Sequence, residues 1–108
     1  MELHNTKASD APAGASQTKS IRFFYVYVLR SLVKNWLYVG YSENLKQRFN
    51  EHNSGKSSST AKHKPYELIH YEAYRNIKDA KRRELYLKTT KGKTTLKTMI
   101  KEYLKARK

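Results

Sequence analysis

The sequence has no cysteine, and this absence excludes several kinds of site at once. Disulfide bonds, zinc-thiolate centres, iron–sulfur clusters and cysteine nucleophiles all need a thiol. Long apolar runs are also missing, since no stretch reaches the roughly 18 residues that cross a membrane. The first residues contain no apolar signal segment either. We therefore expect a cytoplasmic protein without membrane contact, whose chemistry uses groups other than thiols.

Acidic residues are scarce, with 9 Asp and Glu against 23 Lys and Arg, which gives a net charge of +14. Residues 1–20 carry two bases and two acids, so the whole excess lies in residues 21–108. Such a basic region attracts polyanions, and nucleic acid is the partner we expect first. Anionic membrane surfaces would be attracted by the same charge. A basic surface without a specific role, as in many ribosome-associated proteins, is the other alternative.

The 108 residues suffice for one domain with one modest core. Residues 1–20 are rich in Ala, Ser, Thr and Gly and have no hydrophobic period, which predicts a disordered tail before a domain over residues 21–108. From Ile21 to Arg30 β-branched and aromatic residues predominate, which predicts a largely buried strand. Residues 36–41 predict its antiparallel partner in a hairpin.

The remaining sequence predicts helices around a third strand. Ser42 or Asn44 can cap a helix over residues 44–53, which Gly55 ends. A basic stretch with no apolar anchor before Pro65 predicts a mobile loop, and the alternation over residues 66–74 predicts a strand.

Asn76 can cap the next helix, which should run to about Thr90 before Gly92 interrupts it. An amphipathic final helix then reaches the end of the chain. The predicted fold class is α/β (α+β), a three-stranded antiparallel sheet flanked by helices in the order ββαβαα.

Polar side chains share a face with apolar ones in the first predicted helix. Four residues follow the spacing of one helical face: Leu45, Arg48, Phe49 and His52. If this face meets the sheet, Arg48 and His52 need polar partners or a solvent-filled cleft, because burying unpaired polar groups is costly. In the structural alternative, the stem of Arg48 lies along the core with its head in water, and His52 is a surface residue near the helix end.

The second predicted helix places a carboxylate in its apolar stripe, which consists of Ile77, Ala80, Glu84 and Leu87. Glutamate is rarely buried without a partner or a metal, so Glu84 is a candidate site residue. An ion pair between Glu84 and Arg48 would explain both residues structurally, whereas an active site framed by the two helices would explain them functionally.

Tyrosines line the predicted hairpin. Strand alternation places Tyr27 on one face of the first strand, and Tyr38 with Gly40 on one face of the second. If the loop is centred on residues 32 and 33, Tyr27 lies directly opposite Tyr38. Strand tyrosines are usually packing residues with a hydrogen-bonded hydroxyl, while a glycine at position 40 would let a ligand approach the backbone closely.

The small number of acidic residues limits the kinds of metal site that the protein can form. Two-metal sites gather several carboxylates, but residues 21–108 hold seven acids at scattered positions. The sequence has neither the Cys-x-x-Cys motif of a zinc deaminase nor the Gly-x-x-x-x-Gly-Lys-Ser/Thr loop of an NTPase. One metal ion on one glutamate is more plausible than a two-metal site.

The hairpin residues resemble the signature of the GIY-YIG nuclease family. Tyr25-Val26-Tyr27-Val28-Leu29 is similar to its first half, with Tyr25-Val26-Tyr27, or simply Val26-Tyr27, replacing Gly-Ile-Tyr, and Tyr38-Val39-Gly40 is similar to its second half. The departure at Val26 is a packing variation that leaves the motif tyrosines in place.

The resemblance continues into both predicted helices. Arg48 stands ten residues after Tyr38, and His52 with Asn53 follows as in the family's Arg-x-x-x-His-Asn helix. Glu84 lies in an Arg-Arg-Glu-x-x-Leu-Lys segment. The similarity covers about residues 22–100 and is greatest to small stand-alone bacterial members, which resemble the N-terminal nuclease domain of the excinuclease C subunit.

The resemblance implies a DNA endonuclease, acting in DNA repair or processing, with one Mg²⁺ or Mn²⁺ ion held by Glu84. It also implies that Arg48 holds the scissile phosphate and that Tyr27 acts as general base or orients the attacking water. Tyr38 would assist by hydrogen bonding near the same phosphate, and His52 would orient the site or share protons.

Basic residues of the loop and the last helices should hold DNA without reading its sequence. The candidate DNA-binding residues are Gly40, Lys56, Lys62, Lys64, Arg82, Lys88, Lys91 and Lys93. The sequence identifies no protein partner. Two alternatives stay open: a nucleic-acid-binding module that does not cut, and a nuclease directed at RNA.

Overall fold

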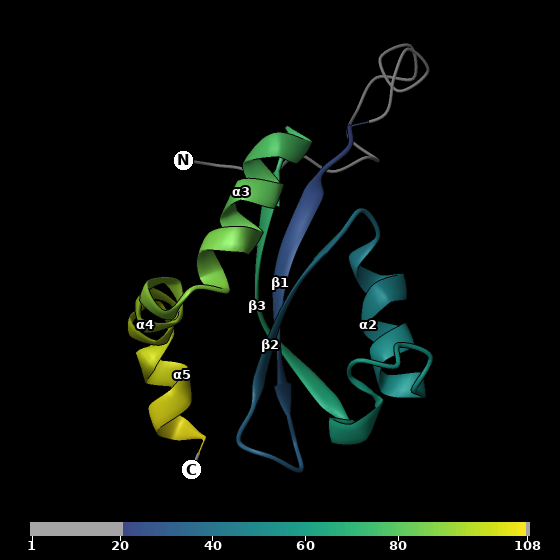
Figure 1. The fold of residues 1–108 in the computed structure, drawn as a ribbon, viewed down its shortest axis with the longest axis vertical. Helices are drawn as coiled ribbons and strands as arrows, with labels where there is room; N and C mark the ends of the chain where they lie inside the picture. Colours follow the sequence, from purple (N-terminus) through teal and green to yellow (C-terminus); the bar gives the residue numbers. More distant parts are fainter. Residues whose placement is uncertain (1–20, 108) are drawn as a thin grey trace, which may run out of the picture.

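The computed structural model describes residues 21–107, and the tail predicted for residues 1–20 lies outside that range. A three-stranded antiparallel sheet separates two groups of helices (Figure 1). The strands are β1 (Phe24–Ser31), β2 (Leu37–Ser42) and β3 (Tyr66–Tyr74), in the spatial order β2-β1-β3. The predicted fold class is confirmed.

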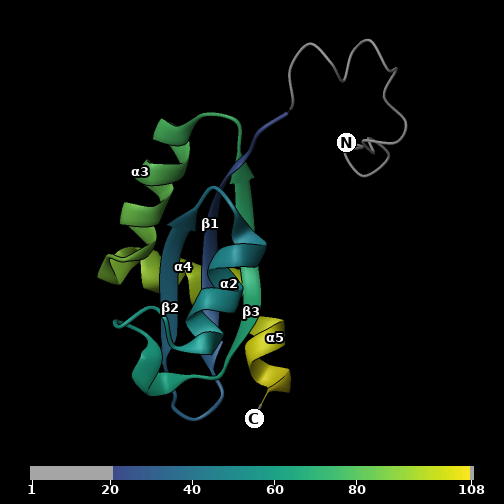
Figure 2. The same ribbon diagram turned by 90° about the vertical axis from the view of Figure 1, so that its right-hand side faces the viewer.

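Helix α2 (Leu45–Ser54) covers one face of the sheet, and Figure 2 shows it in front of the strands. Helix α3 (Ile77–Leu87) covers the other face, with α4 (Thr90–Met99) and α5 (Lys101–Ala106) on the same side (Figure 1). A short 3-10 helix, η2 (Ala61–His63), lies between α2 and β3. Within the described part of the chain, no helix combines the length and apolar character that a bilayer crossing needs.

Both caps of α2 and the N-terminal cap of α3 are those that the sequence predicts. The side chain of Asn44 accepts a hydrogen bond from the backbone N–H of Gln47 and begins α2, while Asn76 accepts one from Lys78 and begins α3. Gly55 ends α2 with a φ of 85°, in the left-handed region that glycine tolerates. These local signals fix both ends of α2 and so the direction in which it crosses the sheet.

Strand β1 supplies side chains to a core on each face of the sheet. Val26 and Val28 are fully buried and pack with residues of β2, α3 and α4, which are Val39, Ala80, Leu87 and Leu96. Tyr27 and Leu29 point to the other face, where they form a second cluster that α2 partly covers. Because both faces are covered, β1 is almost continuously apolar, as in other strands buried on both sides.

The register of the hairpin differs from the predicted one by two residues. Tyr27 lies opposite Gly40, and Tyr38 lies opposite Leu29, so the two tyrosines are diagonal neighbours on one face. The reason is Ser31, whose Oγ accepts hydrogen bonds from the backbone N–H groups of the next turn. These bonds centre the loop on residues 33 and 34 rather than 32 and 33.

The segment between α2 and β3 is anchored, contrary to the prediction of a mobile loop without an anchor. Its anchor is polar: Thr60 is fully buried and Ser57 is 9% exposed. The hydroxyl of Tyr66 donates to the Thr60 carbonyl at 2.7 Å, and Ser31 Oγ donates to the His63 carbonyl at 2.6 Å. A search for apolar residues alone misses such an anchor.

The boundary between α3 and α4 also differs from the prediction. Helix α3 ends at Leu87, and Thr89 caps α4 by accepting a hydrogen bond from the N–H of Gly92. Gly92 therefore lies in the first turn of α4, where a side chain would overlap the Tyr86 carbonyl group. The predicted final helix is also interrupted at Ile100, which separates α4 from α5.

A partly buried ion-pair cluster joins β3 to α3. Glu72 accepts hydrogen bonds from Arg83 at 2.9 and 3.2 Å, from Tyr74 at 2.6 Å and from His70 at 2.9 Å. Burial raises the pKa of Glu72, but these hydrogen bonds, that of Arg83 foremost, outweigh it and hold the value at about 2. The cluster holds α3 against the sheet.

Candidate active site

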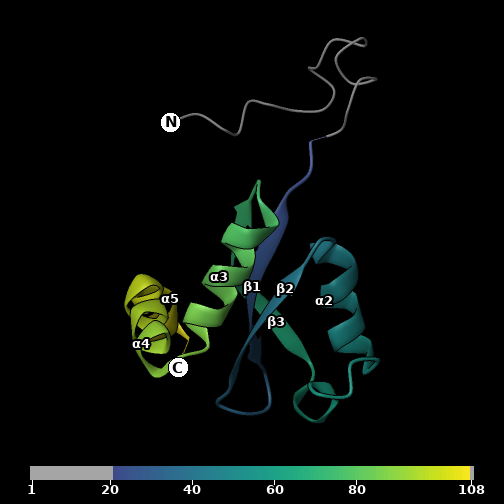
Figure 3. The same cartoon turned by 45° about the horizontal axis from the view of Figure 1, so that its top comes forward.

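The candidate site lies on the face of the sheet that α2 covers. Figure 3 shows α2 beside the hairpin of β1 and β2. The ring centroids of Tyr27 and Tyr38 are 6.3 Å apart. His52 of α2 packs against both rings, with centroid distances of 5.7 Å to Tyr27 and 5.0 Å to Tyr38. Three of the five predicted catalytic residues therefore form one cluster.

Tyr27 and His52 form a buried hydrogen-bonded pair. The Tyr27 hydroxyl lies 2.8 Å from His52 Nε2, and the two residues are 1% and 0% exposed. Burial lowers the pKa of His52, and the positive charge of Arg48 lowers it further. At neutral pH the imidazole is therefore uncharged and can accept a proton. The alternative that His52 is a surface residue is wrong.

The phenol of Tyr27 holds its proton firmly in the free protein. Burial raises its pKa, and Tyr38 raises it further, while the guanidinium of Arg48 offsets part of this increase. A phenol in this state is a poor base by itself. A proton acceptor within hydrogen-bond distance, such as His52, makes loss of its proton easier.

Gly40 provides space for the ring of Tyr27. A Cβ atom at position 40 would lie 2.5 Å from Tyr27 Cζ and 2.9 Å from a ring carbon of Tyr38. The close approach that the sequence suggests for Gly40 is therefore made by the protein's own tyrosine. The glycine leaves room for the Tyr27 ring beside β2, where its hydroxyl reaches His52.

Arg48 lies one turn before His52 on the same helix. Its side chain is 35% exposed, and its Nη1 donates to Glu51 Oε1 at 2.8 Å. The charge of Arg48 acts on the pKa of Tyr27, so the guanidinium lies beside this buried phenol, while part of the side chain faces solvent. This position suits an anion that approaches from solvent, because guanidinium groups bind phosphate oxygens in a fixed geometry.

Glu84 of α3 is mostly buried, with 13% of its side chain exposed, and Lys88 Nζ donates to its Oε2 at 3.0 Å. Glu84 and Arg48 thus pair with neighbours on their own helices, so the structural ion pair between them is not formed. The pKa values of Tyr27 and Tyr41 are raised mainly by burial. The negative charge of Glu84 raises both pKa values by a smaller amount. The carboxylate therefore lies near the β1–β2 hairpin.

The residues around Glu84 fit a hard divalent cation held by one carboxylate. Among residues 21–107, no three His, Cys, Asp or Glu side chains form a cluster that could enclose an ion. Mg²⁺ is commonly bound through one or two carboxylates, with waters and substrate phosphate oxygens completing its shell. A mostly buried glutamate that keeps a small exposed area and pairs with a 47% exposed lysine matches this mode of binding.

The lysines predicted to bind DNA lie on two sides of the sheet. The loop lysines, which are Lys56, Lys62 and Lys64, are exposed and belong to the segment that Thr60 anchors beside His52. The α4 lysines, Lys91 and Lys93, are exposed on the side of the sheet opposite α2 (Figure 1). The structure therefore brings the loop lysines, and not the α4 lysines, to the side of Tyr27 and His52.

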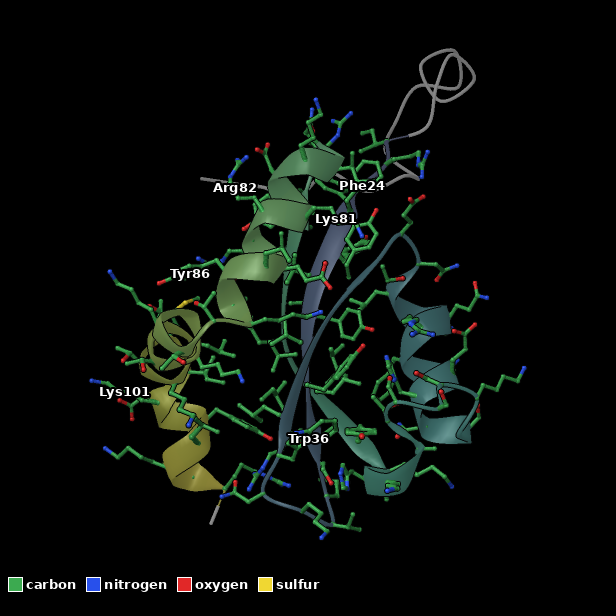
Figure 4. All side chains as sticks on the ribbon, viewed as in Figure 1. Phe24, Trp36, Lys81, Arg82, Tyr86 and Lys101 are labelled. Atoms are coloured by element: carbon green, nitrogen blue, oxygen red, sulfur yellow. The ribbon has the colours of Figure 1, made fainter. Side chains whose placement is uncertain are left out.

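Two further basic candidates are held by acids of their own helix. Arg82 lies on the outer side of α3, directed away from the sheet (Figure 4), and pairs with Asp79 at 2.5 Å. Lys88 pairs with Glu84. Lys81, by contrast, lies over the Tyr41 ring on β2, with Nζ 4.1 Å from the centroid. Arg82 is thus remote from the candidate site, whereas Lys88 lies within it.

The structure adds Thr60 to the site, a residue that sequence reasoning misses. Thr60 Oγ1 lies 2.7 Å from His52 Nδ1, and the residue is fully buried. Next to His52, the Asn53 side chain pairs with the backbone of Tyr66, accepting from its N–H and donating to its carbonyl. A threonine within a Ser- and Lys-rich stretch carries no periodic signal, so only the tertiary contact identifies it.

Comparison with known proteins agrees with this arrangement. Residues 23–98 match the GIY-YIG catalytic domain. A UPF0213 protein of Pediococcus acidilactici is 42% identical over 77 residues, which are 68% of this chain and 78% of that protein. A UPF0213 protein of Staphylococcus haemolyticus is 37% identical over 79 residues, or 72% of this chain and 94% of that protein. No solved structure matches significantly. This chain belongs to the GIY-YIG catalytic-domain family, a family of nucleases.

Proposed function

We propose that this protein is a divalent-metal-dependent endonuclease that hydrolyses phosphodiester bonds of DNA, in DNA repair or processing. The observation that carries the proposal is the buried hydrogen bond between Tyr27 and an uncharged His52, with Arg48 beside it. The family implies a nucleic-acid substrate, and a net charge of +14 favours binding to a phosphate backbone.

Tyr27 and His52 act together as the general base in this proposal. The phenol proton of Tyr27 moves to His52 Nε2, and the phenolate oxygen takes a proton from the attacking water. The resulting hydroxide forms a bond to phosphorus, the bond to the leaving oxygen breaks, and that oxygen takes a proton from solvent. His52 then releases the proton that it received to solvent, which restores the site. Arg48 binds the non-bridging phosphate oxygens, where negative charge increases as the bond forms. Tyr38 assists by hydrogen bonding to the same phosphate.

Glu84 is the residue that would hold the metal, either Mg²⁺ or Mn²⁺. Such a cation, when bound, polarises the phosphate and stabilises charge on the leaving oxygen. Lys88 Nζ donates to Glu84 Oε2 and so gives the mostly buried carboxylate a partner.

The loop lysines contact the DNA backbone next to the cleaved bond. Contacts of lysine with phosphate position the nucleic acid without reading its bases, so we propose little sequence preference. Gly40, Arg82 and the α4 lysines contribute less, because Gly40 is covered by Tyr27 and the others lie away from α2.

A cleavage panel tests the proposal. Labelled duplex, single-stranded, flap and branched DNA, with matched RNA, are incubated with Mg²⁺, Mn²⁺ or EDTA. Wild type is compared with Glu84→Ala and with Glu102→Ala, which removes an exposed acid of α5 as a matched control. We expect metal-dependent cutting by wild type and by Glu102→Ala, and none by a folded Glu84→Ala protein that still binds DNA.

Other results would overturn part or all of the proposal. If wild type and Glu84→Ala give the same cleavage result, this site does not catalyse cutting, and the protein is a nucleic-acid-binding module. Metal-dependent cutting confined to the RNA strands would replace DNA by RNA as the substrate.

A further inference from the structure

Thr60 is a buried polar residue whose role is not explained by packing alone. It is fully buried in a segment of serines and lysines, and its side chain lies against the second nitrogen of His52. Its backbone carbonyl accepts a hydrogen bond from the Tyr66 hydroxyl at 2.7 Å. The main chain of Thr60 is thus held by β3 while its hydroxyl contacts α2.

The hydroxyl of Thr60 has one proton and two neighbours that can receive it, the Ser57 carbonyl and His52 Nδ1. A carbonyl can only accept, so when Thr60 Oγ1 donates to the Ser57 carbonyl at 3.3 Å it can serve only as an acceptor towards His52 Nδ1, 2.7 Å away. Nδ1 must then carry the hydrogen of the neutral imidazole. Nε2, which faces Tyr27 at 2.8 Å, is left with its lone pair.

We propose that Thr60 is a positioning residue that fixes the Nδ1–H tautomer of His52, so that Nε2 can accept the phenol proton of Tyr27. This inference rests on the proposed function for its catalytic consequence, but the tautomer itself is a property of the resting protein. In the opposite tautomer, Nε2–H would donate to the Tyr27 oxygen and could not take its proton. Fixing a tautomer through the second ring nitrogen is a general way to orient a catalytic histidine.

The same arrangement suits His52 after proton transfer. Once Nε2 has gained the Tyr27 proton, both ring nitrogens are donors, and Nδ1–H continues to donate to Thr60 Oγ1. No hydroxyl rotation or side-chain movement is needed during the step. The other titratable or charged groups that face His52 are Tyr38 of β2, Tyr66 of β3, and Arg48 and Glu51 of α2.

Threonine-to-valine substitution tests the role of the hydroxyl, because valine keeps nearly the same shape. Thr60→Val is compared with Thr60→Ser, which restores a hydroxyl, and with Thr98→Val, the same change at an exposed position of α4. The first readout is the His52 tautomer, obtained from long-range ¹H–¹⁵N NMR spectra of the metal-free protein. The second is kcat for cleavage of the best substrate, and thermal unfolding confirms that each variant folds.

We expect Nδ1–H in wild type, Thr60→Ser and Thr98→Val, and a mixed or Nε2–H tautomer in Thr60→Val. We also expect Thr60→Val to lose about 10- to 100-fold in kcat with KM little changed, a part of what a general base contributes. An Nε2–H tautomer in wild type, or an unchanged tautomer in Thr60→Val, would overturn the inference. If wild type shows Nδ1–H but cuts no nucleic acid, the proposed function fails while the positioning role stands.

Discussion

Gly40→Ala should destabilise the protein because the new methyl group would overlap the ring of Tyr27. Gly40 does not have a φ in the left-handed region, so alanine can adopt its backbone conformation. By reducing the freedom of the unfolded chain, alanine alone would add about 0.4 to 1 kcal/mol of stability. The added Cβ lies 2.5 Å from Tyr27 Cζ, however, in a site closed by Tyr38 and His52.

The overlap dominates this balance. Overpacking a well-packed core typically costs about 1 to 3 kcal/mol, which leaves a net loss of roughly 0 to 2.6 kcal/mol, or about 1.3 kcal/mol at the midpoints. For a domain of this size each kcal/mol lowers Tm by about 4 to 8 °C. The displaced Tyr27 should also lose its hydrogen bond to His52, so cleavage should fall together with stability.

Thermal unfolding followed by circular dichroism measures the effect in two backgrounds. In the wild-type background Gly40→Ala should lower Tm, whereas in a Tyr27→Leu background, which lacks the ring, it should be neutral or stabilising. The difference between the two gives the coupling energy of the pair. Equal destabilisation in both backgrounds, or none in wild type, would refute the account of Gly40 as the space for Tyr27.

Three further predictions concern other parts of the molecule. Glu72→Gln should lower the free energy of unfolding by about 2 to 3 kcal/mol at pH 7. The folded pKa of Glu72 is about 2, below its ordinary value of 4.5. The stability that its carboxylate contributes is therefore present above pH 4.5 and is lost as the pH falls towards 2. Urea unfolding at pH 7 and pH 3 measures this loss. If the variant and wild type differ as much at pH 3 as at pH 7, this explanation is wrong. Gly92→Ala should destabilise by about 3 kcal/mol in thermal unfolding, because its Cβ would overlap the Tyr86 carbonyl group, and a stable variant would contradict the packing of α4 on α3. Replacing the three loop lysines by glutamine should reduce the slope of log K against log[salt] by about 2 to 3 in anisotropy titrations with DNA. A larger reduction on replacing the α4 lysines would place the DNA on the opposite side of the sheet.

Much of the fold could be predicted because its signals are local. Asn44 and Gly55 bracket α2 through hydrogen bonds to residues within one turn, and the predicted helix is displaced by a single residue. The alternating run at residues 66–74 gives β3 with its observed bounds. Capping and strand alternation depend on near neighbours, so one sequence suffices to identify them.

Two of the errors occur where two local signals compete. At the hairpin, Ser31 folds the loop back on its own hydroxyl and moves the register by two residues. Between α3 and α4, the Thr89 cap begins a new helix three residues before the glycine that the sequence suggests as the interruption. In each case a hydroxyl group hydrogen-bonded to nearby N–H groups determined the boundary.

The candidate site could be predicted in part. Helical spacing alone places Arg48 and His52 on the face that meets the sheet, and the structure has them there. The partners of these residues depend on tertiary packing: Thr60 lies eight positions after His52 in an irregular segment, and Glu84 pairs with Lys88 rather than with Arg48. No periodic pattern encodes such contacts.

The most direct test of the account is the cleavage rate of Tyr27→Phe, which removes only the hydroxyl that bonds to His52. Tyr25→Phe is the matched control, because Tyr25 lies on the same face of β1 and packs against Tyr71 instead. Single-turnover cleavage of the best substrate with Mg²⁺ gives the rate of the chemical step. The account predicts a loss of about 10²- to 10⁴-fold for Tyr27→Phe and a rate close to wild type for Tyr25→Phe. Cleavage by Tyr27→Phe at the wild-type rate would contradict it.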